Sequence, residues 1–159
     1  MIQRIQTIYL AVVLLISAVL FIPSIAPIVI VKSTSASSFS VVLSLIGIST
    51  DCTFIDQPAS YISLLVLNCL IILFTLFAIF KFNNRPLQVK LCYFSIFLVF
   101  LLWGGMYTFT NMIETKTADP RSVFLLGFYL PPLQVILHFL AANAIKKDEK
   151  LVKSADRLR

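Results

Sequence analysis

The feature that most constrains this chain is a set of long apolar stretches whose interiors carry no Asp, Glu, Lys or Arg. A bilayer core requires about 20 such residues for a spanning helix, which satisfies its backbone polar groups internally. We predict spanning helices over residues 3–22, 61–82, 91–111 and 123–145. The fold class that follows is an all-α membrane protein, a four-transmembrane-helix bundle.

The composition also indicates lipid rather than water as the solvent. Apolar residues make up 59% of the 159 residues and charged residues 13%, whereas the surface of a soluble domain needs roughly 25–35% charged residues. A soluble domain of this length cannot bury so much apolar surface. Because four spanning helices and their connections use the whole chain, we expect a single domain over residues 1–159.

Prolines mark the predicted helix ends, because proline donates no backbone hydrogen bond. Pro23 and Pro27 end the first helix, and Pro120 is placed to start the last one after a short polar loop. Pro131 and Pro132 fall inside the last helix and predict a kink or a break there.

Residues 32–60 form the longest segment between the predicted helices, and their composition differs from that of the helices. Residues 39–48 are rich in β-branched side chains and too few to span a bilayer, which favours a short strand or an interfacial segment. We therefore predict an exterior loop that can form a β-hairpin. The partner of residues 39–48 would be either residues 28–32 or residues 52–55.

Basic residues are divided unevenly between the two sides of the predicted bundle. Loops on the cytoplasmic side of a membrane carry an excess of Lys and Arg. One side holds Arg4, Lys81, Arg85, Lys90, Lys146, Lys147, Lys150, Lys153, Arg157 and Arg159, and the other holds Lys32, Lys116 and Arg121. We predict a multi-pass protein of the bacterial inner membrane with both termini in the cytoplasm. The net charge of +6 then reflects topology, and no nucleic-acid partner is expected.

No catalytic or metal-binding pattern is present in the sequence. The chain has no Ser-His-Asp set, P-loop, dinucleotide glycine pattern or His/Cys cluster, and Cys52, Cys69 and Cys92 lie far apart. We expect no enzymatic activity, no cofactor and no bound metal.

Among the polar residues inside the predicted helices, three are candidates for a functional role: Asn68, Gln134 and His138. Gln134 and His138 are four residues apart and share a helix face. Such side chains either hydrogen-bond between helices, worth about 1 kcal/mol per contact, or line a polar pathway. The pattern favours packing. The alternative is a small transporter or channel with a polar cavity near these residues.

The C-terminal tail, residues 146–159, combines charge with an apolar seam. Leu151, Ala155 and Leu158 recur at helical spacing with Val152 beside them, so we predict that the tail continues the fourth helix as an amphipathic one. Its basic residues suit anionic lipid headgroups at the cytoplasmic face, and its seam suits a groove on a protein partner. The predicted partner-binding residues of the turn and tail are Arg85, Lys90, Leu151, Val152, Ala155, Asp156, Arg157, Leu158 and Arg159.

Three segments resemble a known family: residues 1–10, the turn at residues 85–92 and the tail at residues 144–159. They are similar to the domain-of-unknown-function 4293 family, integral membrane proteins of Bacteroidota. The resemblance covers the whole chain and implies an inner-membrane location and four helices. It supplies no catalytic or ligand-binding residues.

The leading functional hypothesis is a non-enzymatic scaffold or accessory subunit. It would bind a membrane or cytoplasmic protein partner through the cytoplasmic turn and tail, where the ordered sequence features lie outside the bilayer. Besides the transporter or channel, a third class is a membrane-bound sensor whose residues 39–58 face outward.

Overall fold

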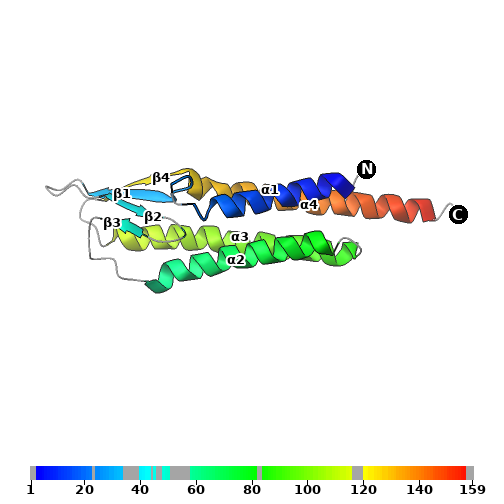
Figure 1. The fold of residues 1–159 in the computed structure, drawn as a ribbon, viewed down its shortest axis with the longest axis horizontal. Coiled ribbons are helices and arrows are strands. Elements are labelled where there is room, and N and C mark those ends of the chain that lie inside the picture. Colours follow the sequence, from blue (N-terminus) through cyan, green and yellow to red (C-terminus); the bar gives the residue numbers. More distant parts are fainter. Residues whose placement is uncertain are drawn as a thin grey trace.

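The computed structural model describes residues 3–22, 24–33, 40–43, 45, 48–50, 58–81, 84–115 and 120–156. These residues form α1 (Gln3–Val19), β1 (Val29–Ser33), β2 (Ser40–Leu43), β3 (Ile48–Thr50), α2 (Pro58–Phe80), α3 (Arg85–Glu114), β4 (Pro120–Phe124) and α4 (Leu126–Asp156). The helices lie side by side along the long axis of the molecule (Figure 1). The strands gather at one end, and the ends of α1 and α4 nearest the chain termini lie at the other, which we call the helical end.

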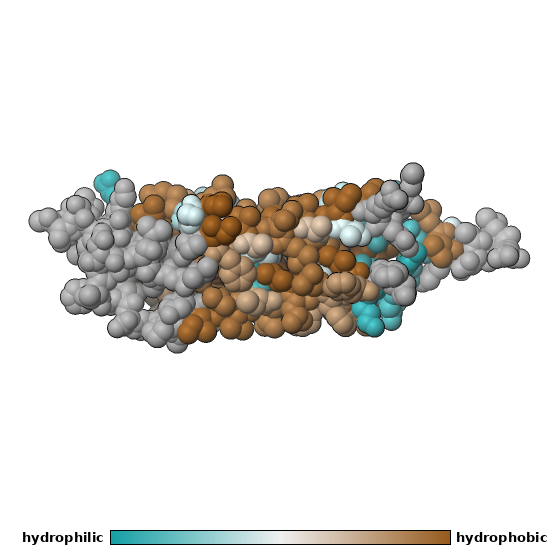
Figure 2. Space-filling model, in the orientation of Figure 1, coloured by the Kyte–Doolittle hydropathy of each residue, from teal (hydrophilic) through white to brown (hydrophobic). Residues whose placement is uncertain are grey.

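Three helices in the described part of the chain are long and apolar enough to cross a membrane, over Ile62–Phe80, Arg85–Glu114 and Leu126–Val152. The apolar part of α1, Ile5–Val19, is shorter. On the face shown in Figure 2, apolar residues form a band across the middle of the molecule, with hydrophilic residues toward its ends. The predicted, mainly helical architecture is confirmed, and three of its helices are compatible with a membrane.

The helices surround a common interior. α3 packs against α2 and α4, α4 packs against α1, and α1 contacts α2 less extensively. The buried residues of α3 recur every three or four positions, so one face of this helix points inward along its whole length. A cluster around Val99 and Met106 fills the bundle toward the sheet, and a second cluster around Leu10 and Ala141 fills it toward the helical end.

The strands form a four-stranded antiparallel sheet in the order β3-β2-β1-β4. The predicted pairing of residues 39–48 with residues 28–32 is present, because β1 pairs β2 with Val29 opposite Leu43. The alternative partner, residues 52–55, lies outside the described residues, as does Cys52. β1 also pairs β4, with Val29 opposite Phe124, and the sequence analysis missed this strand.

Two predicted helix starts were wrong. Residues 120–124 are strand rather than the start of the last helix, and α4 begins at Leu126. Pro120 suits the first position of an edge strand, where the missing N–H costs no ladder hydrogen bond. α3 begins at Arg85, six residues before the predicted start at residue 91, because Pro86 occupies its first turn, where proline is tolerated.

The far ends of the helices also differ from the prediction. α1 ends at Val19, and the N–H groups of Phe21 and Ile22 bond three residues back in a tightened last turn. α4 continues through Pro131 and Pro132, so the predicted break is absent. Its run to Asp156 confirms that the tail extends the fourth helix.

The start of α4 contacts the segment that follows α1. The N–H of Leu125 donates to the carbonyl of Ile28 at 2.9 Å, and the N–H of Gly127 donates to the carbonyl of Pro27 at 3.0 Å. A β-carbon on Gly127 would lie 2.6 Å from the carbonyl oxygen of Ala26. Backbone therefore contacts backbone here, which requires glycine.

Candidate functional site

Ser17 lies at the centre of a buried polar cluster that joins α1, α2 and α4. Nδ2 of Asn68 donates to the Ser17 carbonyl at 3.1 Å, and Nε2 of Gln134 donates to Oγ of Ser17 at 2.9 Å. The Ser17 hydroxyl donates to the carbonyl of Val13 at 3.0 Å. Asn68 and Gln134 are brought together through a serine that the sequence analysis did not select.

His138 belongs to the same interior. Its Nδ1 lies 3.0 Å from the carbonyl oxygen of Gln134, and its Nε2 lies 3.2 Å from Oγ1 of Thr75. Because a carbonyl only accepts, Nδ1 carries the proton, and in a neutral ring Nε2 accepts from the Thr75 hydroxyl. That hydroxyl also lies 2.7 Å from the carbonyl of Ile71, so it divides its proton between two acceptors. His138 thus connects α4 to α2.

The cluster is closed to solvent. Ser17, Asn68, Thr75, Gln134 and His138 are each 0% exposed. Within the part of the chain that the structure describes, Oδ1 of Asn68 and Oε1 of Gln134 lack a hydrogen-bond partner. The hydrogen bonds of the cluster therefore join helices, and two of its buried acceptor atoms remain without a partner among the described residues.

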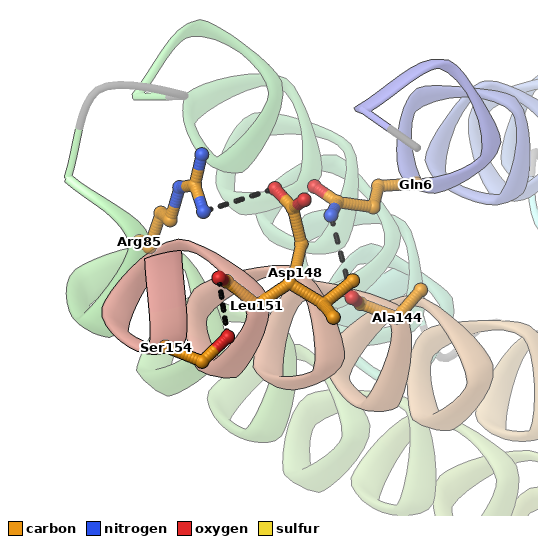
Figure 3. A network of polar contacts seen from close by, with 6 residues as sticks. All are labelled: Gln6, Arg85, Ala144, Asp148, Leu151 and Ser154. Atoms are coloured by element: carbon orange, nitrogen blue, oxygen red, sulfur yellow. Dashed lines mark hydrogen bonds and ion pairs between the residues drawn. The ribbon is translucent and has the colours of Figure 1, made fainter. Parts of the chain in front are cut away.

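A pocket of about 330 Å³ lies at the helical end of the bundle, away from this cluster. Its lining comes from all four helices: Gln6, Thr7, Ile79, Phe80, Arg85, Gln88 and Asp148. Figure 3 shows the carboxylate of Asp148 between the guanidinium of Arg85 and the amide of Gln6. The sequence analysis selected Arg85 but none of the others in this pocket.

An ion pair connects the start of α3 to α4 across this pocket. Nη1 of Arg85 lies 3.1 Å from Oδ2 of Asp148, with side-chain exposures of 23% and 11%. The two atoms are close, but their geometry is not that of a hydrogen bond. Nε2 of Gln6 donates to the carbonyl of Ala144 at 3.4 Å, joining α1 to the same stretch of α4. The structure therefore shows Arg85 in an intramolecular contact.

The buried face of α4 continues past the helical end of the bundle. Its inward positions alternate in spacings of four and three residues, through Gln134, His138, Ala141, Ile145 and Asp148. The next positions carry Leu151 and Val152, which are 47% and 43% exposed. Figure 1 shows α4 projecting beyond the other helices at this end.

The remaining predicted partner-binding residues lie partly inside and partly outside the described structure. Lys90 is exposed on α3. Ala155 and Asp156 lie in α4, but their side chains are outside the described part of the structure, and Arg157, Leu158 and Arg159 lie beyond it altogether. Among the described residues, no three His, Cys, Asp or Glu side chains gather as a metal site requires.

A family model described as a domain of unknown function, DUF4293, matches residues 2–158, nearly the whole chain. No curated protein and no solved structure is detectably similar to this chain.

Proposed function

Because this chain belongs to the DUF4293 family, for which no activity is defined, we propose its function from geometry: a non-enzymatic scaffold or accessory subunit of the bacterial inner membrane. It binds a protein partner through the projecting end of α4. Origin in Bacteroidota, which the sequence resemblance implies, stays a prediction.

The membrane placement uses all four helices as spans. α1 has 17 residues and is about 26 Å long at 1.5 Å per residue. The turns that follow it, closed by the bond from the Ala26 N–H to the Ile22 carbonyl, lengthen this segment. Lys81, Arg85 and Lys90 at the helical end support a cytoplasmic position for that end and for both termini.

The observation that carries the proposal is the exposed continuation of α4's inward face. A helix buries an apolar stripe where a neighbour covers it. Leu151 and Val152 lie on the stripe but beyond the neighbours, so they are about half exposed. Full burial of one such side chain is worth about 1.5–3 kcal/mol. A partner with an apolar groove gains this free energy by covering the stripe.

The lysines of the same segment support a competing use. Lys147 and Lys150 are exposed, and their positive charges suit anionic lipid headgroups. A membrane anchor needs these lysines, whereas a partner groove needs Leu151 and Val152. The two roles can therefore be separated by mutation.

The test compares two matched double variants of the full chain, purified with affinity tags from native membranes. We expect Leu151→Ser with Val152→Ser to lose the co-purifying protein, and Lys147→Ser with Lys150→Ser to retain it. Both pairs place serines in the same helical segment, so helix propensity is matched. Retention of the partner by the Leu151 and Val152 variant would contradict the proposal.

The second candidate function is a small transporter or channel. It is favoured by the unpartnered carbonyl oxygens of Asn68 and Gln134 in a fully buried cluster with His138, since polar groups inside spanning helices often mark ion or substrate paths. Uptake measured in vesicles would support it if Gln134→Leu with His138→Leu abolished the flux. An unchanged flux would remove it.

A further inference from the structure

The pocket at the helical end is amphipathic and of headgroup size. Its volume of about 330 Å³ is at the lower limit of small-molecule sites, roughly 300–1,000 Å³. One wall carries the Arg85 and Asp148 charges, and Gln6 and Gln88 add amides that are 6% and 5% exposed. Polar groups this deeply buried favour a ligand with several hydrogen-bonding atoms.

The charges on the wall specify a ligand that carries both signs. Arg85 retains donors beyond its single contact with Asp148, and a guanidinium binds phosphate oxygens through two parallel bonds. The carboxylate of Asp148 accepts hydrogen bonds and favours an ammonium group. An anion alone would face Asp148, and a cation alone would face Arg85, at short range in a poorly solvated site.

The part of the pocket lining that α2 contributes is apolar and continues onto the outside of the bundle. Ile79 and Phe80 line the pocket, and Phe80 is 74% exposed. Phe77 and Leu73, one and two turns back on α2, are 45% and 58% exposed and extend the same face. A ligand with a polar head in the pocket can place an acyl chain along this stripe.

We propose that the pocket binds the headgroup of a phospholipid that carries both a phosphate and a primary ammonium, as phosphatidylethanolamine does. Arg85 binds the phosphate, Asp148 binds the ammonium, and the Leu73, Phe77 and Phe80 stripe contacts an acyl chain. This site rests on the membrane placement proposed above and is independent of partner binding by the end of α4.

The test uses the full chain in detergent, titrated with single lipids and observed by native mass spectrometry. The lipids are phosphatidylethanolamine, phosphatidylglycerol, which lacks the ammonium, and phosphatidylcholine, whose ammonium has no N–H. We expect the first to bind about tenfold more tightly, because its ammonium donates N–H hydrogen bonds to Asp148 while its phosphate accepts from Arg85. Asp148→Asn should remove the preference for phosphatidylethanolamine over phosphatidylglycerol. Arg85→Gln should weaken the binding of both of these lipids.

Two further variants separate binding from folding. Neutralising one member of a partly buried ion pair also weakens the fold. Thr7→Phe instead adds a bulky side chain at an exposed residue that lines the pocket and leaves both charges in place; it should lower phosphatidylethanolamine binding without lowering the thermal midpoint. Lys90→Gln removes one positive charge from α3 outside the pocket and should change neither.

Equal affinity for the three lipids, or binding unaffected by Thr7→Phe, would overturn the proposal. Soluble O-phosphoethanolamine distinguishes the source of the headgroup: if it bound as tightly as the lipid, the pocket would serve a free metabolite and the lipid assignment would be wrong. Thr7→Phe should leave partner co-purification intact, and the Leu151 and Val152 variant should leave lipid binding intact. Failure of this site and failure of the proposed function are therefore distinguishable.

Discussion

Gln134 donates a hydrogen bond to Ser17 at 2.9 Å, across two helices whose residues are separated by 117 positions in the chain. Both side chains are fully buried, and Ser17 also accepts from Asn68 through its carbonyl. This contact locks α1, α2 and α4 in one register.

We expect Ser17→Ala and Gln134→Leu each to lower the free energy of unfolding by about 1 kcal/mol, because interhelical hydrogen bonds in lipid are worth roughly 0.6–2 kcal/mol. The double variant should lose less than the sum, with a coupling of about 0.5–1.5 kcal/mol. Unfolding in mixed micelles measures all four forms. Strictly additive losses would show that the two side chains do not interact.

Three glycines give a graded series on replacement by alanine. At Gly127 the new methyl group meets backbone carbonyl oxygens at 2.6 and 2.8 Å, which cannot move aside, so a loss of about 1–3 kcal/mol is expected. At Gly105 it meets the flexible end of Leu64 at 2.7 Å, and at Gly104 nothing lies within 4 Å. Gly105→Ala should cost less, and Gly104→Ala should gain up to about 1 kcal/mol from helix propensity. Thermal melts in detergent rank the three, and a Gly127→Ala variant as stable as Gly104→Ala would contradict the close contact.

The β1–β4 register predicts a specific cross-link. Ile30 lies opposite Val123, whereas Ser122 lies opposite Val31 and its side chain points to the other face of the sheet. In a chain whose native cysteines are replaced, Ile30→Cys with Val123→Cys should oxidise to a disulfide, and Ile30→Cys with Ser122→Cys should not. The chain is then cleaved between the two strands, and a non-reducing gel shows whether the two fragments remain linked by the disulfide. Efficient cross-linking of the second pair would indicate a register shifted by one residue.

The proposed topology predicts opposite labelling of the two ends. In a chain without native cysteines, Ser154→Cys at the end of α4 should react with an impermeant maleimide only after the membrane is opened. Arg121→Cys in β4, which is exposed at the sheet end, should react in intact cells. Labelling of Ser154→Cys in intact cells would reverse the orientation.

The helices could be predicted from the sequence because their signal is local. Uncharged apolar runs identify spanning segments whatever they pack against, and the spacing of Gln134 and His138 places them on one face of a helix. Ser17 and Thr75 gave no such signal. Each also bonds to a carbonyl four residues back in its own helix, which is the ordinary behaviour of Ser and Thr in helices, so their contacts with Gln134 and His138 depend on the assembled bundle.

The features that were missed depend on residues far apart in the chain. β4 is a strand because it pairs with β1, some 90 residues earlier, and its five residues have no local pattern that separates a strand from a helix start. Asp148 was not selected as a site residue from the sequence. Its pairing with Arg85 follows from the position of α3 beside α4, which periodicity within either helix does not determine.

Strand β1 and helix α1 find partners in β4 and α4, which the ribosome makes well after them. In the proposed membrane placement, α1 therefore enters the lipid while Ser17 and Gln6 still lack their contacts with α4. Contacts of such long sequence separation form late and slowly. Packing of α1 is consequently completed only by α4, and a chain truncated before α4 would leave polar side chains of α1 without their partners.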